Sequence, residues 1–310
     1  ILLDIQPGDE VIMPSYTFVS SANAFVLRGG IPVFVDIRQD TLNIDETLIE
    51  EAITSKTKAI LPVHYAGVAC EMDSIMEIAS KHQLFVVEDA AQGIMSKYKG
   101  RSLGSIGDLG CLSFHETKNI ISGEGGALLI NNKIFTKRAE MIREKGTDRT
   151  QFFRGEVDKY SWQDIGSSFL PGETMAAFLF AQLEEAQSIT NKRLKIWHEF
   201  NEFFSLVNSE KQFSIPVIPN QCETNGHLYY LLMNNKAERE NFIAYMKSES
   251  VNCIFHYIPL HDSFAGKKYG RVATSMHVTE SLSSRIVRLP LWVGLDTSHV
   301  TKSFSNWNKR

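Results

Sequence analysis

The feature that most constrains this chain is an alternation, up to Lys145, of short apolar runs with segments of helical periodicity. Residues 72–82 carry apolar side chains at positions 72, 75, 76, 78 and 79, which is the spacing of one helix face. Residues 84–87 follow as a wholly apolar run that ends at two acids, Glu88 and Asp89. Apolar strands that alternate with helices predict an α/β domain with a largely parallel sheet.

The same reasoning divides the chain into two parts. In the first part it predicts strands at residues 9–13, 32–36, 58–64, 84–87, 111–114 and 127–130, and helices at 20–27, 44–53, 72–82 and 134–144. Residues 146–169 are polar and aromatic with little periodicity, and the length of this stretch predicts a functional loop. Two helices are predicted next, at 174–188 and 194–208, followed by strands at 227–233, 253–258 and 287–291 and a helix at 239–248. We therefore expect a large α/β domain over residues 1–190 and a smaller α+β domain over residues 191–310.

Composition excludes several classes of protein. The chain has 310 residues, of which 43% are hydrophobic and 22% charged, values typical of a globular protein and not of a disordered one. A net charge of −4 gives no electrostatic reason to bind nucleic acid or an anionic membrane. The sequence contains no apolar run as long as a membrane span. The four cysteines stand far apart without a CxxC pair, which favours reduced thiols and a cytoplasmic location.

Two common kinds of site are excluded by missing motifs. The acidic strand end at Glu88 and Asp89 lacks the G-x-G-x-x-G turn about 20 residues earlier that a dinucleotide site requires. The phosphate loop G-x-x-x-x-G-K-[ST] is also absent. His256 and His261 stand five apart across Pro259, which is not a same-face helical pair, so we expect no metal site.

The ends of the predicted strands favour a different chemistry, because ligands of open α/β sheets bind beyond the carboxyl ends of the strands. Three such ends carry Phe18, Asp89 and Ser113, and Lys118 follows the third. Pyridoxal phosphate requires a lysine amine for a Schiff base and a carboxylate against its ring nitrogen. It also requires an aromatic face for the ring and a hydroxyl for the phosphate. Each residue alone has an ordinary structural explanation, such as a helix-capping aspartate, but the combination favours this cofactor.

At these positions the chain resembles the DegT/DnrJ/EryC1/StrS aminotransferases, a family that acts on nucleotide-linked sugars. The resemblance runs in family order from Ile1 to about Leu291. It is carried by the motifs GDEVIMPSYTF at 8–18, VEDAAQ at 87–92, SFHETKN at 113–119, GEGG at 123–126 and HYIPLH at 256–261. The resemblance implies a fold type I transferase that uses pyridoxal 5′-phosphate and works as a homodimer, with active sites at the subunit interface.

The resemblance also implies roles for the residues that match the family motifs. Lys118 would form the Schiff base with the cofactor and would carry a proton between substrate and cofactor. Asp89 would pair with the pyridine nitrogen, and Gln92 would lie beside the phenolic oxygen of the ring. Phe18 would stack on the ring, and Ser113 would bind the phosphate.

Further residues are candidates for the same site. Many relatives carry an asparagine, in a G-x-N-x-R pattern, that reaches the phosphate in the partner subunit. This chain has GSSFL at 166–170, so Ser168 is the expected substitute. His115 stands three residues before the lysine and is a candidate catalytic residue, with packing at a strand end as the alternative. Three aromatic or polar residues are candidate contacts to the sugar or nucleotide: Tyr16, His256 and Tyr257.

The implied activity is a ping-pong transamination. Glutamate would donate its amino group, and C4 of dTDP-4-keto-6-deoxyglucose would receive it, giving dTDP-4-amino-4,6-dideoxygalactose for enterobacterial common antigen. The sequence GSSFLP at 166–171 resembles the branch that acts on dTDP-sugars. Alternatives are another sugar aminotransferase or a dehydratase of the family, although dehydratases carry a histidine in place of Lys118. A catalytically idle member with a dimerisation or regulatory role is a further alternative, because the family's upstream phosphate-binding segment precedes Ile1 and is expected to be missing here.

Overall fold

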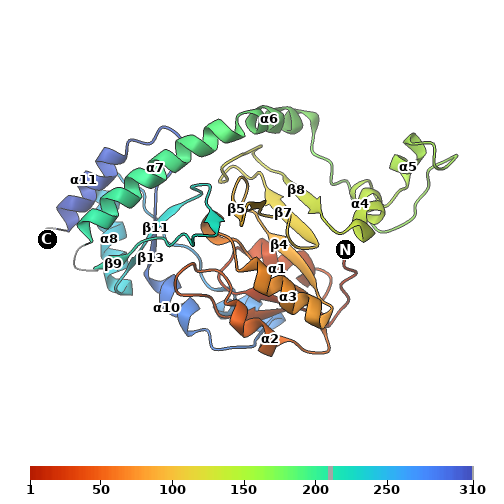
Figure 1. Cartoon of the computed structure of the whole chain (residues 1–310), viewed down its shortest axis with the longest axis horizontal. Helices are drawn as coiled ribbons and strands as arrows, with labels where there is room; N and C mark the ends of the chain where they lie inside the picture. Colours follow the sequence, from red (N-terminus) through yellow and green to blue (C-terminus); the bar gives the residue numbers. More distant parts are fainter. Residues whose placement is uncertain (209–211, 309–310) are drawn as a thin grey trace.

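The computed structural model describes residues 1–208 and 212–308, so residues 209–211 and 309–310 of the expected second domain lie outside it. A seven-stranded sheet forms its centre (Figure 1). In spatial order the strands are β12 (Arg271–Val272), β2 (Ile31–Val35), β1 (Glu10–Pro14), β3 (Thr57–Ile60), β4 (Phe85–Asp89), β7 (Leu109–Ser113) and β8 (Gly126–Ile130). Neighbours run parallel except β7 and β8, which are antiparallel. The prediction of a largely parallel α/β sheet is confirmed.

Strands β1 and β2 are buried on both faces, because their successive side chains point into different apolar layers. Ile12 and Val33 pack in one layer, and their neighbours Val11 and Phe34 pack in the other. The helices of this part of the chain are α1 (Val19–Val26), α2 (Ile49–Ala52), α3 (Met72–His82) and α4 (Thr136–Arg143). Burial on both faces explains why the strands read as continuous apolar runs in the sequence.

The predicted helices agree with the structure to different degrees. The helix predicted at 72–82 has the same bounds as α3, which ends where Gln83 turns into the left-handed conformation (φ 55°). The helix predicted at 44–53 is shorter. The Asp45 carboxylate accepts the N–H of Thr47 and begins a 3₁₀ turn at Glu46–Leu48, so α2 keeps a single turn.

The strand predicted at 253–258 is wrong. Ile254 forms an isolated bridge with Arg288, and the carbonyl of His256 accepts a hydrogen bond from the Tyr16 hydroxyl. Phe255 and Ile258 are exposed, so the apolar pattern in this segment does not reflect a buried strand. The backbone is used instead to hold the segment against the first part of the chain.

The C-terminal part has its own sheet, in the order β13-β11-β9, with antiparallel neighbours. Its elements are α6 (Glu173–Glu184), α7 (Ala186–Val207), β9 (Phe213–Ser214), β11 (Tyr229–Met233), α8 (Lys236–Ser248), α9 (Phe264–Tyr269), α10 (His277–Arg285), β13 (Ile286–Leu289) and α11 (Thr297–Trp307). A third, small sheet joins β5 (Lys97–Tyr98), β6 (Arg101–Ser102) and β10 (Cys222–Glu223). The sequence patterns did not predict β5, β6, β9, β10, β12, α9, α10 or α11.

Aromatic side chains form most of the core of this C-terminal part. Phe204, Tyr229, Phe242 and Phe304 are fully buried, and the rings of Phe204 and Phe304 meet edge to face with centroids 4.9 Å apart. Removing such a side chain from water contributes about 1.5–3 kcal/mol. The core therefore fixes α7, α8 and α11 against the small sheet.

The two parts share structural elements. Residue 190 lies inside α7, and β12 of the C-terminal part pairs with β2 in the large sheet. The guanidinium of Arg271 binds the carboxylate of Glu10 with two hydrogen bonds of 2.8 Å. A domain boundary near residue 190 stays a prediction.

Residues 146–169 connect the parts and include α5 (Arg149–Phe153). Figure 1 shows α5 extending away from the large sheet. Within the described ranges, the helices lack the combination of length and apolar content that crossing a membrane requires.

Candidate active site

A cavity of about 570 Å³ lies at the carboxyl ends of β4 and β7. Asp89 is the last residue of β4, Ser113 is the last residue of β7, and Lys118 lies in the loop that follows; all three line the cavity. Tyr257 and Arg288, from the C-terminal part, also line it. Parallel strands end at the same edge of a sheet, which is why residues distant in sequence meet here.

Most of the predicted site residues reach this cavity. Those that line it are Phe18, Asp89, Gln92, Ser113, His115, Lys118, His256 and Tyr257. Two predicted residues, Tyr16 and Ser168, lie outside its described lining. Ser168 is exposed, and its backbone bridges Glu144 at the base of the segment that carries α5. The chemical roles of all these residues stay predictions.

Asp89 is held at the end of β4 by donors on both of its carboxylate oxygens. The Ser21 hydroxyl donates to Oδ2 at 2.6 Å, and the N–H of Ala91 donates to Oδ1 at 3.1 Å. Thr17 is hydrogen-bonded to Ser21 at 2.9 Å and so supports its orientation. A carboxylate has about four acceptor positions, so the side chain is fixed while acceptor capacity remains for a ligand.

Lys118 presents an amine with no internal partner. No hydrogen bond or ion pair to its Nζ is found among residues 1–208 and 212–308. Burial lowers the pKa of this amine; the nearby Asp89 carboxylate opposes that shift, and the positive charge of Arg288 adds to it. A lowered pKa increases the fraction of neutral amine, which is the nucleophilic form.

Gln92, Tyr257 and Phe18 form an aromatic and polar side of the cavity. Gln92 Oε1 accepts the N–H of Ala66 at 2.7 Å, and its Nε2 donates to the Tyr257 hydroxyl at 3.2 Å. The ring of Phe18 is 57% exposed and lies 6.4 Å from the ring of Tyr257. Phe18 thus offers a ring face to a ligand, whereas Gln92 is held by the chain itself.

His256 belongs to a connected network beneath Arg288. Arginine can only donate hydrogen bonds, so His256 Nε2 accepts from Arg288 Nη1 at 3.1 Å, and the ring proton lies on Nδ1, facing the Tyr65 hydroxyl at 3.1 Å. Burial, together with the charges of Arg288 and Lys118, lowers the pKa of His256 to about 2 and keeps the ring neutral.

Tyr16 takes part in this network and differs from its expected position. It is 1% exposed, its hydroxyl lies 3.4 Å from that of Tyr65, and it donates to the carbonyl of His256. Tyr16 packs in a buried cluster, and its hydroxyl holds the backbone at His256 close to the end of β1. The structure therefore places it behind the wall of the cavity and not at the surface that a substrate contacts.

His115 and Ser113 lie where β7 leads into the lysine loop. His115 Nδ1 is hydrogen-bonded to the Thr117 hydroxyl at 2.9 Å, and its Nε2 lies 3.7 Å from a carboxylate oxygen of Glu124. Among the described residues, the Ser113 hydroxyl has a single weak contact, accepting the N–H of His115 at 3.4 Å. It is therefore available for a ligand.

Among the lining residues that were not predicted are two with ionisable side chains from the C-terminal part, His227 and Arg288. His227 is buried, and its Nδ1 is hydrogen-bonded to the side-chain oxygen of Asn119, next to Lys118. Burial and the charges of Lys118 and Arg193 lower its pKa. No local pattern marks either residue, because they come from the C-terminal part and reach the cavity only through tertiary packing.

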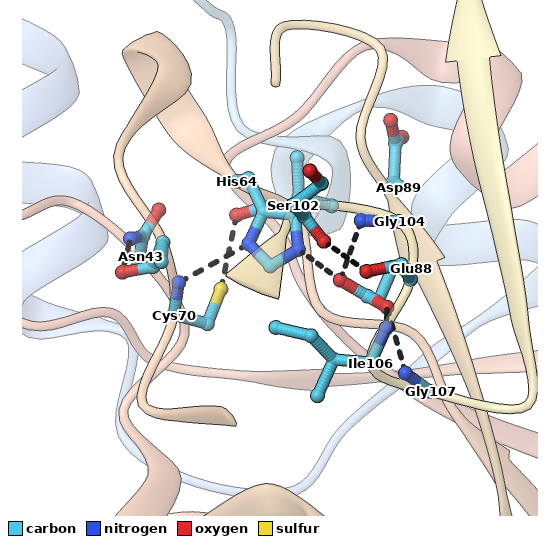
Figure 2. A network of polar contacts seen from close by, with 12 residues as sticks. Asn43, His64, Cys70, Glu88, Asp89, Ser102, Gly104, Ile106 and Gly107 are labelled. Atoms are coloured by element: carbon cyan, nitrogen blue, oxygen red, sulfur yellow. Dashed lines mark hydrogen bonds and ion pairs between the residues drawn. The ribbon is translucent and has the colours of Figure 1, made fainter. Parts of the chain in front are cut away.

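A second polar cluster lies on the other side of β4, around Glu88 (Figure 2). Glu88 is fully buried, and both of its oxygens accept two hydrogen bonds. The donors are His64 Nε2 at 2.9 Å and the N–H groups of Gly104 at 2.8 Å, Ile106 at 2.6 Å and Gly107 at 2.7 Å. Figure 2 shows the side chain of Asp89 pointing away from this cluster.

The donor set of the cavity fits pyridoxal phosphate. It combines an unpartnered amine at Lys118, a carboxylate with free acceptor capacity at Asp89, an accessible ring face at Phe18 and a free hydroxyl at Ser113. Across the described residues, no group of three or more His, Cys, Asp or Glu side chains could hold a metal ion.

Comparison with known proteins agrees with this geometry. Residues 1–305 match the pattern of the DegT/DnrJ/EryC1/StrS aminotransferase family. The chain is 37% identical to a GDP-perosamine synthase of Caulobacter vibrioides, over 97% of this chain and 79% of that protein. It is 30% identical to a UDP-4-amino-4-deoxy-L-arabinose–oxoglutarate aminotransferase of Shewanella sediminis, over 97% of this chain and 80% of that protein.

A solved structure shows the same fold in a cofactor-bound state. The pyridoxal-phosphate form of the putative sugar aminotransferase Spr1654 from Streptococcus pneumoniae superposes with a TM-score of 0.88 at 26% identity. The alignment covers 99% of this chain and 82% of that one. Fold, site chemistry and sequence relatives thus agree, and we conclude that the chain belongs to the DegT/DnrJ/EryC1/StrS family and is a pyridoxal-phosphate-dependent sugar aminotransferase.

Proposed function

We propose that this chain transfers the amino group of glutamate to C4 of dTDP-4-keto-6-deoxyglucose. It then acts as a dTDP-4-amino-4,6-dideoxygalactose transaminase, and its product enters enterobacterial common antigen. Membership of the family supports aminotransfer to a sugar. The likeness of GSSFLP at 166–171 to the dTDP-sugar branch supports the narrower substrate.

The observation that carries the proposal is the meeting of Lys118 and Asp89 in one cavity. The lowered pKa of Lys118 suits an amine that takes a proton from the substrate carbon and returns it. Asp89 is fixed by Ser21 and the N–H of Ala91, so its charge stays in one place while the proton moves. These two residues supply the base and the counter-charge that an amino transfer requires.

The other residues that line the cavity would hold the cofactor in place. Pyridoxal phosphate, when bound, withdraws electrons from the substrate carbon and so makes its proton removable. Asp89 would hold the proton of the ring nitrogen, Phe18 would cover one ring face and Ser113 would bind the phosphate. Gln92 would face the phenolic oxygen through the amide that now contacts Tyr257.

Cofactor attachment tests the lysine assignment directly. Protein incubated with pyridoxal phosphate is expected to turn yellow, and borohydride reduction followed by peptide mass analysis should find the label on Lys118. Lys118→Ala should remove the label, whereas Lys58→Ala, at an exposed lysine of β3, should retain it. A colourless protein, or a label on another lysine, would contradict the proposal.

The substrate requires a separate test, because one relative is named for a GDP-sugar and another for a UDP-sugar. Glutamate-dependent turnover should be compared for 4-keto-6-deoxyglucose attached to dTDP, UDP and GDP, and for a 3-keto dTDP-sugar. The proposal expects the highest kcat/KM for the dTDP-linked 4-keto sugar. A preference for another nucleotide or for the 3-keto sugar would keep the enzyme class and refute this substrate.

We further propose that two copies assemble with shared active sites in the cytoplasm. Ser168 lies outside the cavity of its own chain, as expected of a residue that serves a partner. Exposed apolar side chains lie nearby in sequence, at Phe169, Leu170 and, on α6, Phe178 and Phe180. All four cysteines are free thiols, which suits a reducing compartment.

The assembly has its own test. Light scattering should give a molar mass twice that of one chain. Phe180→Asp should lower the measured mass toward that of a single chain. Mixing Lys118→Ala with Ser168→Ala chains should restore part of the activity that each variant lacks. A monomeric, fully active wild type would refute the shared site.

A further inference from the structure

Arg288 carries a charge that the described chain does not neutralise. It lines the cavity from β13, and its Nη1 donates to the neutral ring of His256. Its Nε is buried and has no hydrogen-bond partner in the part of the chain that the structure describes. Across residues 1–208 and 212–308 no carboxylate forms an ion pair with it. An arginine placed in this way at a ligand cavity is set up to bind an anion.

The surroundings fix the direction of the guanidinium. His256 accepts from Nη1, and His256 is itself held by Tyr65 through Nδ1 and by Tyr16 through its carbonyl. The backbone of Arg288 is tied to the same segment, since its N–H donates to the carbonyl of Ile254 at 2.7 Å. The position of this cation is therefore set by the protein before any ligand arrives.

The location favours one anion over others. Arg288 is close enough to Lys118 to lower the pKa of its amine. An α-amino acid presents its carboxylate one bond away from the carbon that gives up nitrogen, so a donor reacting at Lys118 places a carboxylate beside this cation. The diphosphate of a nucleotide sugar is separated from the reacting carbon by the sugar ring.

We propose that Arg288 binds the α-carboxylate of the amino donor in the first half of the reaction. This inference rests on the proposed aminotransfer and names the residue that recognises its first substrate. His256 acts as a positioning residue, because its Nε2 accepts a hydrogen bond from the guanidinium.

The test combines kinetics with binding of an unreactive ligand. In Arg288→Gln the KM for glutamate should rise roughly 10- to 100-fold, the usual effect of losing a charge-assisted hydrogen bond. Binding of glutarate, measured by calorimetry, should weaken by a similar factor. The KM for glutamate of Arg288→Lys should lie between those of wild type and Arg288→Gln, because lysine keeps the positive charge and loses the paired N–H donors of the guanidinium. Cofactor absorbance and the KM for the nucleotide sugar should stay within about twofold.

Arg285→Gln provides the matched control. Arg285 lies three residues earlier, at the end of α10, and bonds to the carbonyls of Ser281 and Met233 away from the cavity. Its substitution should leave the KM for glutamate unchanged, and melting temperatures should show that all three variants fold.

Other results would overturn the assignment. An unchanged KM for glutamate with a raised KM for the nucleotide sugar would assign Arg288 to the diphosphate, and loss of cofactor would assign it to the cofactor phosphate. Failure of the wild type to transaminate would refute the proposed function separately. Glutarate binding would still decide whether Arg288 recognises a carboxylate.

Discussion

Glu88 and Asp89 are consecutive carboxylates on β4, and the structure uses them in opposite ways. Glu88 is fully buried, and protein donors fill both of its oxygens (Figure 2). Asp89 lines the cavity and accepts from two protein donors, Ser21 and the N–H of Ala91. Successive residues of a strand point to opposite faces of the sheet. These two neighbouring carboxylates therefore lie in different environments.

The difference teaches how a carboxylate can be assigned from its partners. Donors to Glu88 come from the backbone at residues 104–107 and from His64, whose proton must lie on Nε2 because its Nδ1 accepts the N–H of Cys70. This saturation favours the charged form, and the hydrogen bonds of His64, Gly107 and Gly104 lower the pKa of Glu88 although burial opposes the shift. A saturated carboxylate stabilises the fold, whereas an unsaturated one is available for chemistry.

The largest expected effect comes from Asp89→Asn. It should reduce kcat by roughly 10²–10⁴-fold, because the side chain keeps its shape and loses the charge that faces the ligand. The free energy of unfolding should change by less than about 1 kcal/mol. Single-turnover kinetics and urea unfolding measure the two quantities. If Asp89→Asn lost several kcal/mol of unfolding free energy together with its activity, the distinction between the two carboxylates would be wrong.

Glu88→Gln should show the reverse pattern. The amide of glutamine places an N–H₂ group against N–H groups that donate to the carboxylate in the wild type. The free energy of unfolding should therefore fall by about 2–4 kcal/mol. Protein that remains folded should keep its kcat within about tenfold, since Glu88 is outside the cavity lining. Urea unfolding and active-site titration separate these effects. A stable but inactive variant would place Glu88 in the chemistry.

The pH dependence of stability should reflect the same carboxylate. Because the pKa of Glu88 is lowered in the folded protein, its contribution is fully present above its unfolded pKa of about 4.3 and is lost as the pH falls through the folded value. The difference in unfolding free energy between wild type and Glu88→Gln should be constant above about pH 5 and shrink at lower pH. A difference that stays constant down to pH 3 would contradict the assignment.

The smallest expected effect comes from Ser21→Ala, which tests how Asp89 is held. It removes one donor from Asp89 and leaves the charge, so kcat/KM should fall by about two- to tenfold. Asn23→Ala, at an exposed residue of α1 outside the cavity lining, is the control and should change nothing. A loss as large as that of Asp89→Asn would mean that the Ser21 hydroxyl takes part in the chemistry itself.

Much of the site could be predicted from the sequence, because its residues lie at the ends of strands that the apolar runs reveal. The apolar run before Asp89 and the run before Ser113 locate two carboxyl ends of one sheet, and the loop with Lys118 continues from the second. The helix at 72–82 could be placed because its periodicity is unbroken and Gln83 ends it.

The remaining features depend on tertiary contacts that leave no local pattern. Arg288 and His227 enter the cavity from another part of the chain. Tyr16 has an aromatic ring and a hydroxyl, as many binding residues do, yet its hydroxyl donates to the carbonyl of His256. The false strand at 253–258 has the same origin, because an apolar pattern does not show whether the backbone finds a strand or a side chain as its partner.

The pairing of β12 with β2 limits how this enzyme can be cut or recombined. Residues 271–272 close the outer side of a strand that belongs to the first part of the chain, and Arg271 neutralises Glu10 there. A fragment ending near residue 190 would leave β2 with unpaired N–H and C=O groups, which invite pairing with other chains. The two halves are thus poor modules for exchange between relatives, and a chimaera would have to carry residues 271–272 with the sheet they complete.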